Sequence, residues 1–355
     1  MIKSINEVLI KLYAPESLIY KEILGKEENK EKASLFYSYI SQKFKEFIEI
    51  AKEVDEKELI EALHRFNGAI NIGFKGNISK QRFVNLLKKI CNELKTILEE
   101  CYAANQSKAF IELEKLLGKE GVETRNSTFG KYLHEQYINY CMTKIDSSKV
   151  LYRVRDCNSD EPRDNCWHTP YNIRQYAYAG RFSTPGFPCL YLSDSPETSM
   201  EEVGKLQKEY RLIGTFTLKK GKIFSCIDLR FPLGKEEIEK TTEKEKIELF
   251  LSYPLRLLCT CPTIEKRKSN AFAEEYLFSQ VLINVIMSPN NENSGMLNVD
   301  GICYNSTKRI GGINYALPAK TKSVPPKQDE KFSKQLEDLF DHPKPQEIKK
   351  KFVSL

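Results

Sequence analysis

The strongest constraint in this sequence is a change in the spacing of its apolar residues near residue 150. Before that point, apolar side chains recur every three or four positions, as in the sets Phe36, Ile40, Phe44, Phe47, Ala51 and Phe83, Leu87, Ile90, Leu94, Leu98, Cys101. This period predicts amphipathic helices, and the residues just before the second set, including Ser79, can cap it. Because such stripes need partners, residues 1–148 are predicted to form an all-α helical bundle.

After residue 148, short β-type runs replace the helical stripes. They cover residues 150–154, 189–192, 212–218, 223–229, 299–304 and 313–317, and turns rich in Gly and Pro separate them. Two helices are expected between them, one opening at Asp194-Ser195-Pro196 and one over residues 271–286. The mixture predicts an α+β domain with a bent or split β-sheet over residues 149–318.

The Lys- and Pro-rich residues 319–355 are expected to form a flexible or loosely docked extension. A short helix around residues 332–340 is the only regular element predicted there.

Composition limits the possible classes of function. No apolar run approaches the roughly 18 residues that a membrane span needs, and the N-terminus lacks the layout of a secretory signal, so we expect a cytoplasmic protein without a membrane association. The net charge is +6, from 55 basic and 49 acidic residues. Opposite charges alternate along the chain, which is typical of solvated helix faces and argues against a nucleic-acid groove.

Cysteine spacing gives no support for a metal site. The ten cysteines include no Cys-x-x-Cys pair, and Cys157, Cys166 and His168 match no common zinc pattern. We therefore expect buried or surface thiols and no metal. His168 is interpreted as a structural or pocket-wall residue.

The densest group of potential ligand-binding residues begins at His168 and ends at Glu202. Arg181 follows Gly180 in a turn, where its guanidinium can bind a phosphate. Tyr191, on the next predicted strand, offers a flat ring for a heterocycle. This combination favours a ligand that contains both a phosphate and an aromatic ring.

The helix after that strand carries two adjacent glutamates. At about 100° per residue, Glu201 falls on a solvated stripe with Glu197 and Lys205, whereas Glu202 borders the buried face. A carboxylate at that border can be partly desolvated and directed into a cleft, so Glu202 is the candidate catalyst. The alternative is an ordinary helix-border carboxylate paired with a lysine.

A second group follows the apolar run Gly301-Ile302-Cys303-Tyr304-Asn305, which ends at Ser306. A short strand that delivers a hydroxyl at its end is a common way to place a ligand-binding serine. The alternative is that Ser306 satisfies backbone groups.

Taken in order, these residues resemble the RES domain family. The resemblance rests on Tyr152-Arg153, Gly180-Arg181-Phe182, Leu190-Tyr191-Leu192, Glu202 and the run from Gly301 to Ser306, and it covers roughly residues 150–318. It implies an ADP-ribosyltransferase-like fold that binds NAD⁺. Members of the family are toxins, mostly of bacterial toxin–antitoxin pairs, that deplete NAD⁺ by hydrolysis or phosphorolysis; some transfer ADP-ribose to a protein.

Carried over to this sequence, the resemblance assigns a role to each matching residue. Arg153 and Arg181 would hold the phosphates and the nicotinamide-side ribose, with Arg155 as the alternative to Arg153. Tyr191 would stack on the nicotinamide, and Tyr152 would belong to the same NAD⁺ site. Glu202 would act on the ribose, with Glu201 as the alternative that the helical angle disfavours, and Ser306 would hydrogen-bond in the same pocket.

The residue types suit cleavage of an N-glycosidic bond. Such cleavage passes through an oxocarbenium-like state, whose positive charge a carboxylate stabilises. The same carboxylate can hold the 2′-hydroxyl or orient an attacking water. Because the nicotinamide is already cationic, the reaction needs neither a metal nor a strong general acid.

The resemblance leaves the acceptor and the partners open. With water or phosphate as acceptor the protein would be an NAD⁺ glycohydrolase or phosphorylase, and with a macromolecule it would be a mono-ADP-ribosyltransferase acting on a protein or nucleic acid. A toxin of this kind implies an antitoxin or a trigger protein, as in toxin–antitoxin pairs or phage defence. Residues 1–148 are then interpreted as a regulatory, sensing or dimerising bundle, with homo-oligomers formed through its helices.

A further alternative makes the helical half a nucleic-acid-binding or nuclease module beside a degenerate RES domain. HEPN-type helical domains accompany RES domains, and this half is similar to them in size and helicity. Their nuclease signature is an Arg followed closely by a His, but Arg125 and His134 are too far apart and His64-Arg65 has the wrong order. The regulatory interpretation is therefore favoured.

Overall fold

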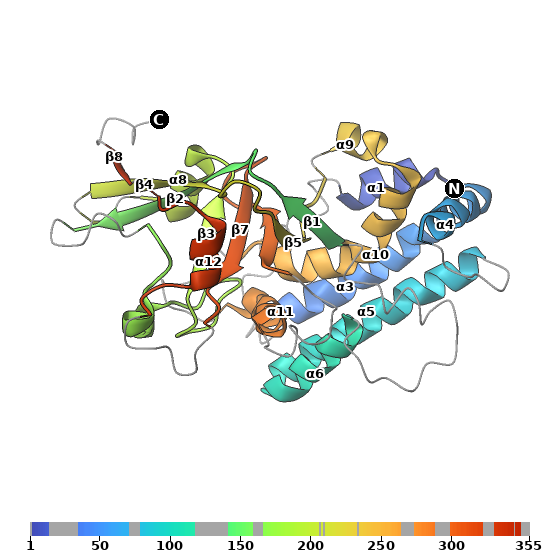
Figure 1. Cartoon of the computed structure of the whole chain (residues 1–355). Helices are drawn as coiled ribbons and strands as arrows, with labels where there is room; N and C mark the ends of the chain where they lie inside the picture. The colour runs from blue at the N-terminus through green and yellow to red at the C-terminus, as the bar shows by residue number, and fades with distance from the viewer. Residues whose placement is uncertain are drawn as a thin grey trace. The chain divides into compact units, whose positions relative to one another are not determined.

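The protein forms two compact units, which the contacts between residues delimit as Met1–Cys141 with Phe231–Val285, and Met142–Arg230 with Ile286–Leu355. The structure is a computed structural model (Figure 1). It describes residues 2–13, 35–70, 79–117, 141–158, 166–205, 207–208, 210–232, 234–263, 273–287, 299–321, 330–343 and 345–348.

The first unit is built from helices. They are α1 (Ile5–Tyr13), α3 (Leu35–Ala51), α4 (Glu56–Ile70), α5 (Lys80–Tyr102), α6 (Gln106–Leu116), α9 (Lys235–Lys240), α10 (Glu243–Thr260), the 3₁₀ turn η4 (Glu274–Tyr276) and α11 (Leu277–Met287), whose last two residues belong to the second unit. Both predicted apolar stripes, on α3 and α5, are buried, and Ser79 caps α5 by accepting a hydrogen bond from the Arg82 amide at 3.3 Å. The helical character predicted for this part of the chain is confirmed.

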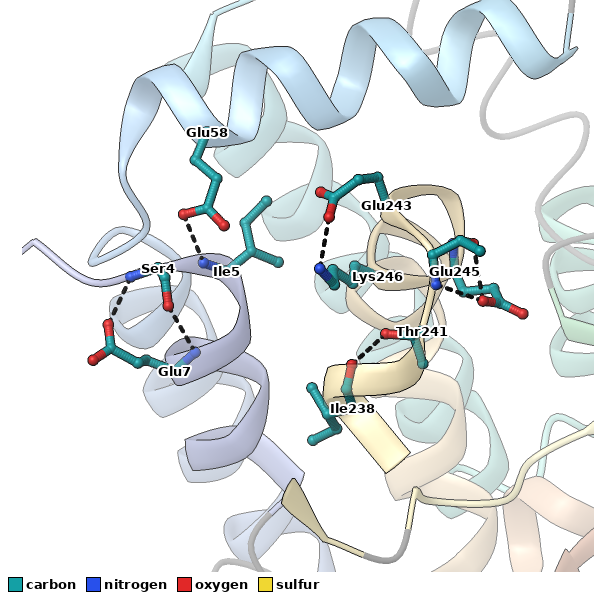
Figure 2. Close-up of polar contacts among 10 residues, drawn as sticks. Ser4, Ile5, Glu7, Glu58, Ile238, Thr241, Glu243, Glu245 and Lys246 are labelled. Atoms are coloured by element: carbon teal, nitrogen blue, oxygen red, sulfur yellow. Dashed lines mark hydrogen bonds and ion pairs between the residues drawn. The ribbon is translucent and has the colours of Figure 1, made fainter. Parts of the chain in front are cut away.

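Helix α10 lies at the centre of this unit and was not predicted. Every residue from Leu249 to Thr260 is buried, and the helix packs against α1, α3, α4 and α5. A helix that is buried on all sides needs no separate polar face, which is why its sequence gave no clear amphipathic stripe. Its start is clear in the structure: Thr242 and Glu245 form a reciprocal capping box, and Lys246 pairs with Glu243 at 2.6 Å (Figure 2).

The first helix is anchored in a comparable way. The Ser4 hydroxyl accepts from the Glu7 amide at 3.2 Å, and the Glu7 carboxylate accepts from the Ser4 amide at 2.8 Å (Figure 2). The Ile5 amide donates to Glu58 of α4 at 3.1 Å. Three amides at the start of α1 are therefore bonded to side-chain oxygens, those of Ser4 and Ile5 to carboxylates and that of Glu7 to a hydroxyl.

The second unit contains a mixed eight-stranded sheet with the order β1-β5-β6-β7-β3-β2-β4-β8. Its strands are β1 (Met142–Ile145), β2 (Val150–Cys157), β3 (Cys189–Ser193), β4 (Tyr210–Thr217), β5 (Phe224–Asp228), β6 (Gly301–Asn305), β7 (Ile313–Pro318) and β8 (Gln346–Ile348). All neighbours are antiparallel except β5 and β6. The predicted α+β class is confirmed. The sequence patterns did not predict the two short strands β1 and β8.

The sheet is weakly connected between β2 and β3. These strands share one registered pair, Tyr152 with Ser193, whereas β2 and β4 pair over eight positions from Val150 to Cys157. The main-chain ladder is thus nearly interrupted at this point. Three candidate site residues lie on the strands that flank it: Tyr152 and Arg153 on β2, and Tyr191 on β3.

The C-terminal segment differs from the expected loose extension. Helix α12 (Lys334–Leu339) buries Leu336 and Leu339, and Phe340 joins the same core. Strand β8 then pairs with β4. The segment docks because its few apolar residues complete the core of the second unit, which local composition does not reveal; residues 322–329 and 349–355 lie outside the described part of the chain.

The compact units also differ from the single boundary expected near residue 148. Residues 231–285, inside the stretch assigned to the catalytic domain, group with the N-terminal helices. Arg125 and His134, weighed above as a nuclease pair, are outside the described residues. Among the helices that the structure describes, none combines the length and hydrophobicity needed to cross a bilayer.

Candidate active site

The candidate carboxylate Glu202 is presented by α8 (Pro196–Val203), a short helix with well-defined ends. Ser195 is its N-cap and accepts from the Thr198 amide at 3.1 Å, with Pro196 at the first position. The helix ends at Gly204, whose φ of 74° is readily available only to glycine. The Ser199 hydroxyl accepts from the Val154 amide at 2.8 Å, which fixes α8 against β2.

The structure brings Glu202 and Ser306 together across 104 positions of sequence. The Ser306 hydroxyl donates to Oε1 of Glu202 at 2.6 Å. The same hydroxyl accepts from the amides of Lys308 and Arg309 at 3.1 and 3.0 Å. Because its one hydrogen and both lone pairs are engaged, Ser306 acts on Glu202 in this structure rather than pointing a free hydroxyl into the site.

A second donor to the same oxygen is Asn314, which was not predicted. Its Nδ2 donates to Glu202 Oε1 at 2.6 Å, and its Oδ1 accepts from the Ser193 hydroxyl at 2.8 Å. Both Asn314 and Ser193 are buried, and they are direct partners in the β3–β7 register. A signal was present, since Asn314 is the one amide in the apolar run from Ile313 to Leu317, but its partner depends on sheet order.

The loop from β6 to β7 approaches α8 closely because residue 312 is glycine. A Cβ there would lie 2.6 Å from the Thr198 methyl and 3.2 Å from the Ser306 Cβ. The Gly312 carbonyl accepts from the Ser306 amide at 2.7 Å. Asp194 completes the junction, because its carboxylate accepts from the Ile313 amide at 3.1 Å and from the Thr198 hydroxyl at 3.0 Å.

The two neighbouring glutamates have different surroundings. Glu201 is exposed and makes no hydrogen bond or ion pair within the described part of the chain, whereas Glu202 has the two partners above. Glu202 is nevertheless exposed, which differs from the expected partial desolvation. Its helix is too short to bury the border position, so hydrogen bonds rather than burial hold this carboxylate.

Arg153 on β2 supplies a positive charge in a largely desolvated position. Burial, followed by the neighbouring charge of Arg155, lowers the pKa of Arg153 to about 10, so the guanidinium remains protonated at neutral pH. Cys166, Cys189 and Tyr191 lie near this guanidinium. Its Nη1 is buried and has no hydrogen-bond partner among the residues that the structure describes. A buried donor of this kind suits an anionic ligand.

Tyr191 lies under the turn that carries Arg181. Its hydroxyl donates to Ser183 at 3.1 Å and accepts from the Phe182 amide at 3.1 Å. A Cβ on Gly180 would lie 2.7 Å from that hydroxyl, so only glycine allows the turn to pack this closely against Tyr191. Arg181 itself is 7% exposed. Stacking by Tyr191 and phosphate binding by Arg181 stay predictions.

Tyr152 is placed by strand register. It pairs with Ser193, which in turn pairs with Asn314, so the three residues form a row across β2, β3 and β7. Glu202 contacts the end of this row through Asn314. Arg153 and Tyr191 are neighbours beside it, although no hydrogen bond or ion pair within the described ranges joins Arg153 to Glu202.

The residues weighed as metal ligands are engaged otherwise. His168 Nδ1 donates to the Thr169 carbonyl at 2.8 Å, and Nε2 accepts from the Ser333 amide at 3.0 Å. Cys157 and Cys166 are fully buried, and all ten cysteines are free. Over the described ranges, no three His, Cys, Asp or Glu side chains come together as a metal-binding group.

Comparison with known proteins gives a family match and a curated relative. A family model described as the RES domain matches residues 150–335. A Bacillus subtilis (strain 168) protein named "Putative toxin YopC" is 28% identical over 196 residues. That alignment covers 52% of this chain and 43% of the relative, so this chain accounts for less than half the length of that protein. No solved structure gives a significant match.

Proposed function

This chain belongs to the RES domain family, and on that premise we propose that it binds NAD⁺ and cleaves the bond between nicotinamide and ribose. The observation that carries the proposal is the convergence of Glu202 and Ser306, whose Oε1 and Oγ atoms are 2.6 Å apart. Residues of two distant segments are held together at an exposed carboxylate.

The cationic residues support a ligand with a pyrophosphate. Arg153 keeps its charge in a desolvated position and has a buried Nη1 without a partner in the described structure. A guanidinium of this kind binds phosphate oxygens with charge-assisted hydrogen bonds. In the proposed complex, Arg153 and Arg181 hold the phosphates, and Tyr152 and Tyr191 line the nicotinamide end.

The proposed reaction balances without a metal or a general acid. The C1′–N bond breaks, its electron pair moves to the nicotinamide nitrogen, and nicotinamide leaves as a neutral molecule. Glu202 stabilises the positive charge that develops on the ribose. A water oxygen then bonds to C1′ and loses its proton to the carboxylate or to solvent, which yields ADP-ribose and nicotinamide.

We extend the proposal to a toxic role. A curated relative is named "Putative toxin YopC", and depletion of NAD⁺ would harm the cell that contains the enzyme. A protein with this activity needs restraint, which an antitoxin, a trigger or the helical unit of the chain itself could provide. The N-terminal helices are accordingly proposed to regulate or oligomerise the protein.

The proposal is tested by the release of nicotinamide from NAD⁺ by the purified full chain. We expect release with water alone, and a loss of roughly 100-fold or more in Glu202→Gln, because the substitution removes the charge that stabilises the transition state. Glu201→Gln is the matched control: it makes the same change one residue away, at a side chain without partners in the described structure, and should retain the wild-type rate.

Two results would change the assignment. Equal rates for the two glutamine variants would remove Glu202 from the reaction. Release of nicotinamide that requires an added protein or nucleic acid, with ADP-ribose attached to it, would make the protein a mono-ADP-ribosyltransferase instead.

A further inference from the structure

We infer that Asn314 and Ser193 are positioning residues that hold the carboxylate of Glu202 in the orientation needed for the reaction. The inference rests on the proposed function, since it concerns the same carboxylate. It assigns a role to two buried residues, on strands β7 and β3, that the sequence patterns did not identify as site residues.

The geometry defines a chain of two hydrogen bonds. Ser193 Oγ donates to Asn314 Oδ1 at 2.8 Å, and Asn314 Nδ2 donates to Glu202 Oε1 at 2.6 Å. The first bond fixes the second: an amide that accepts at Oδ1 must present its NH₂ group on the other side, toward the carboxylate. Ser193 therefore selects the amide orientation that can donate to Glu202.

The Asn314 side chain is held rigidly, whereas the Glu202 side chain that it contacts is not. Asn314 is 4% exposed and lies within the β3–β7 ladder, opposite Ser193, so its side chain has little freedom. Glu202 is exposed, near the end of a short helix, where an unsupported glutamate samples several rotamers. A buried amide that binds one oxygen removes much of this freedom before substrate arrives.

The donors leave one oxygen of the carboxylate available. Both Asn314 and Ser306 bond to Oε1, and Oε2 accepts no hydrogen bond from any residue described in the structure. Oε2 is therefore the oxygen that meets the ribose or the attacking water. Because both donors are neutral, they orient the carboxylate without the ion pair that a lysine or arginine would form, so its charge remains available to the transition state.

The experiment is a double-mutant cycle on nicotinamide release, with Asn314→Ala, Ser193→Ala and the double variant. Asn314→Ala should lower kcat roughly 10- to 100-fold and change KM for NAD⁺ less than about threefold, because the amide orients the carboxylate but does not touch the substrate. Ser193→Ala should lower kcat by a smaller factor. In the Asn314→Ala background it should add nothing, because its only effect passes through the amide.

The near-isosteric Asn314→Asp variant separates a positioning role from a purely structural one, because only a positioning role predicts a change in the pH dependence of the rate. The introduced carboxyl group can donate to Glu202 only while it is protonated, and the two carboxylates repel each other when both are ionised. The rate of this variant relative to wild type should therefore rise as pH is lowered from about 8 to about 6. Asn172→Asp, the same change at an exposed position, is the control and should show no such rise.

The outcomes separate this inference from the proposed function. If Glu202→Gln is inactive while Asn314→Ala retains wild-type kcat, or the two alanine effects simply multiply, the positioning role is wrong and the catalytic assignment survives. If Glu202→Gln is fully active, the proposed function fails first. If Asn314→Ala does not fold, the other two variants test the inference. It is overturned if Ser193→Ala has the wild-type kcat and the rate of Asn314→Asp relative to wild type does not change with pH.

Discussion

His168 is a buried histidine whose hydrogen bonds require the neutral form of its ring. The side chain is fully buried, and Nε2 accepts a hydrogen bond from the Ser333 amide at 3.0 Å, which requires that this nitrogen carry no proton. Burial lowers the pKa of His168 to about 4, outweighing the stabilising hydrogen bond to the Thr169 carbonyl. His168 thus ties the start of the C-terminal segment to the core of the second unit and lies in contact with Tyr171 and Phe332.

We predict that this contact makes folding stability depend on pH. In the unfolded chain His168 takes up a proton near pH 6.5, while in the folded protein it resists protonation until about pH 4. The neutral His168 side chain therefore contributes about 3 kcal/mol to the free energy of unfolding above pH 6.5, and this contribution is lost as the pH falls toward 4. Denaturant unfolding across this range should show a flatter dependence in His168→Gln than in wild type; parallel curves would contradict the prediction.

At the scale of elements, the site depends on the approach of the β6–β7 loop to the start of α8. Gly312 is packed against Thr198, and the neighbouring Ser306 reaches Glu202 only because this approach is close. The loop and the helix are further joined by Asp194, which bonds to both. The contact between Glu202 and Ser306 therefore depends on how the loop and the helix meet, rather than on either of them alone.

Gly312→Ala is expected to separate Ser306 from Glu202. The added methyl group would stand 2.6 Å from the Thr198 methyl, so the loop must move outward. A displacement of this size should reduce nicotinamide release by about 10-fold or more. Gly221→Ala is the control: its φ of 76° makes the substitution cost about 1 kcal/mol of stability, but nothing lies within 4 Å of the new Cβ. Equal turnover in the two variants would argue against a role for the loop contact.

At the scale of the whole chain, the helical unit is assembled from two separate stretches of sequence. Residues 231–285 supply α10, whose buried side chains pack against α1, α3, α4 and α5. The family match from residue 150 to residue 335 therefore runs through a segment that folds with the N-terminal helices. A protein cut at the sequence boundary near residue 148 would lose the partners of α10.

We accordingly predict that deletion of residues 1–141 does not leave a well-folded enzyme. The side chains of Phe250, Leu251, Leu255 and Leu258 would lose their cover, and each contributes roughly 1.5–3 kcal/mol when buried. The shortened protein should aggregate or bind a hydrophobic dye, as size-exclusion chromatography and dye fluorescence would show. A monodisperse fragment with a cooperative unfolding transition would refute this expectation.

The sequence by itself determined the helical first part, the principal strands of the second part and the two segments that carry Glu202 and Ser306. Those features are local, since apolar period, cap residues and strand-end positions are properties of neighbouring residues. Only the tertiary structure decided that Asn314 and Ser193 meet Glu202, that α10 belongs with the N-terminal helices and that the C-terminal segment docks. These contacts depend on which strands and helices become neighbours, and the burial that selects them is summed over the whole fold.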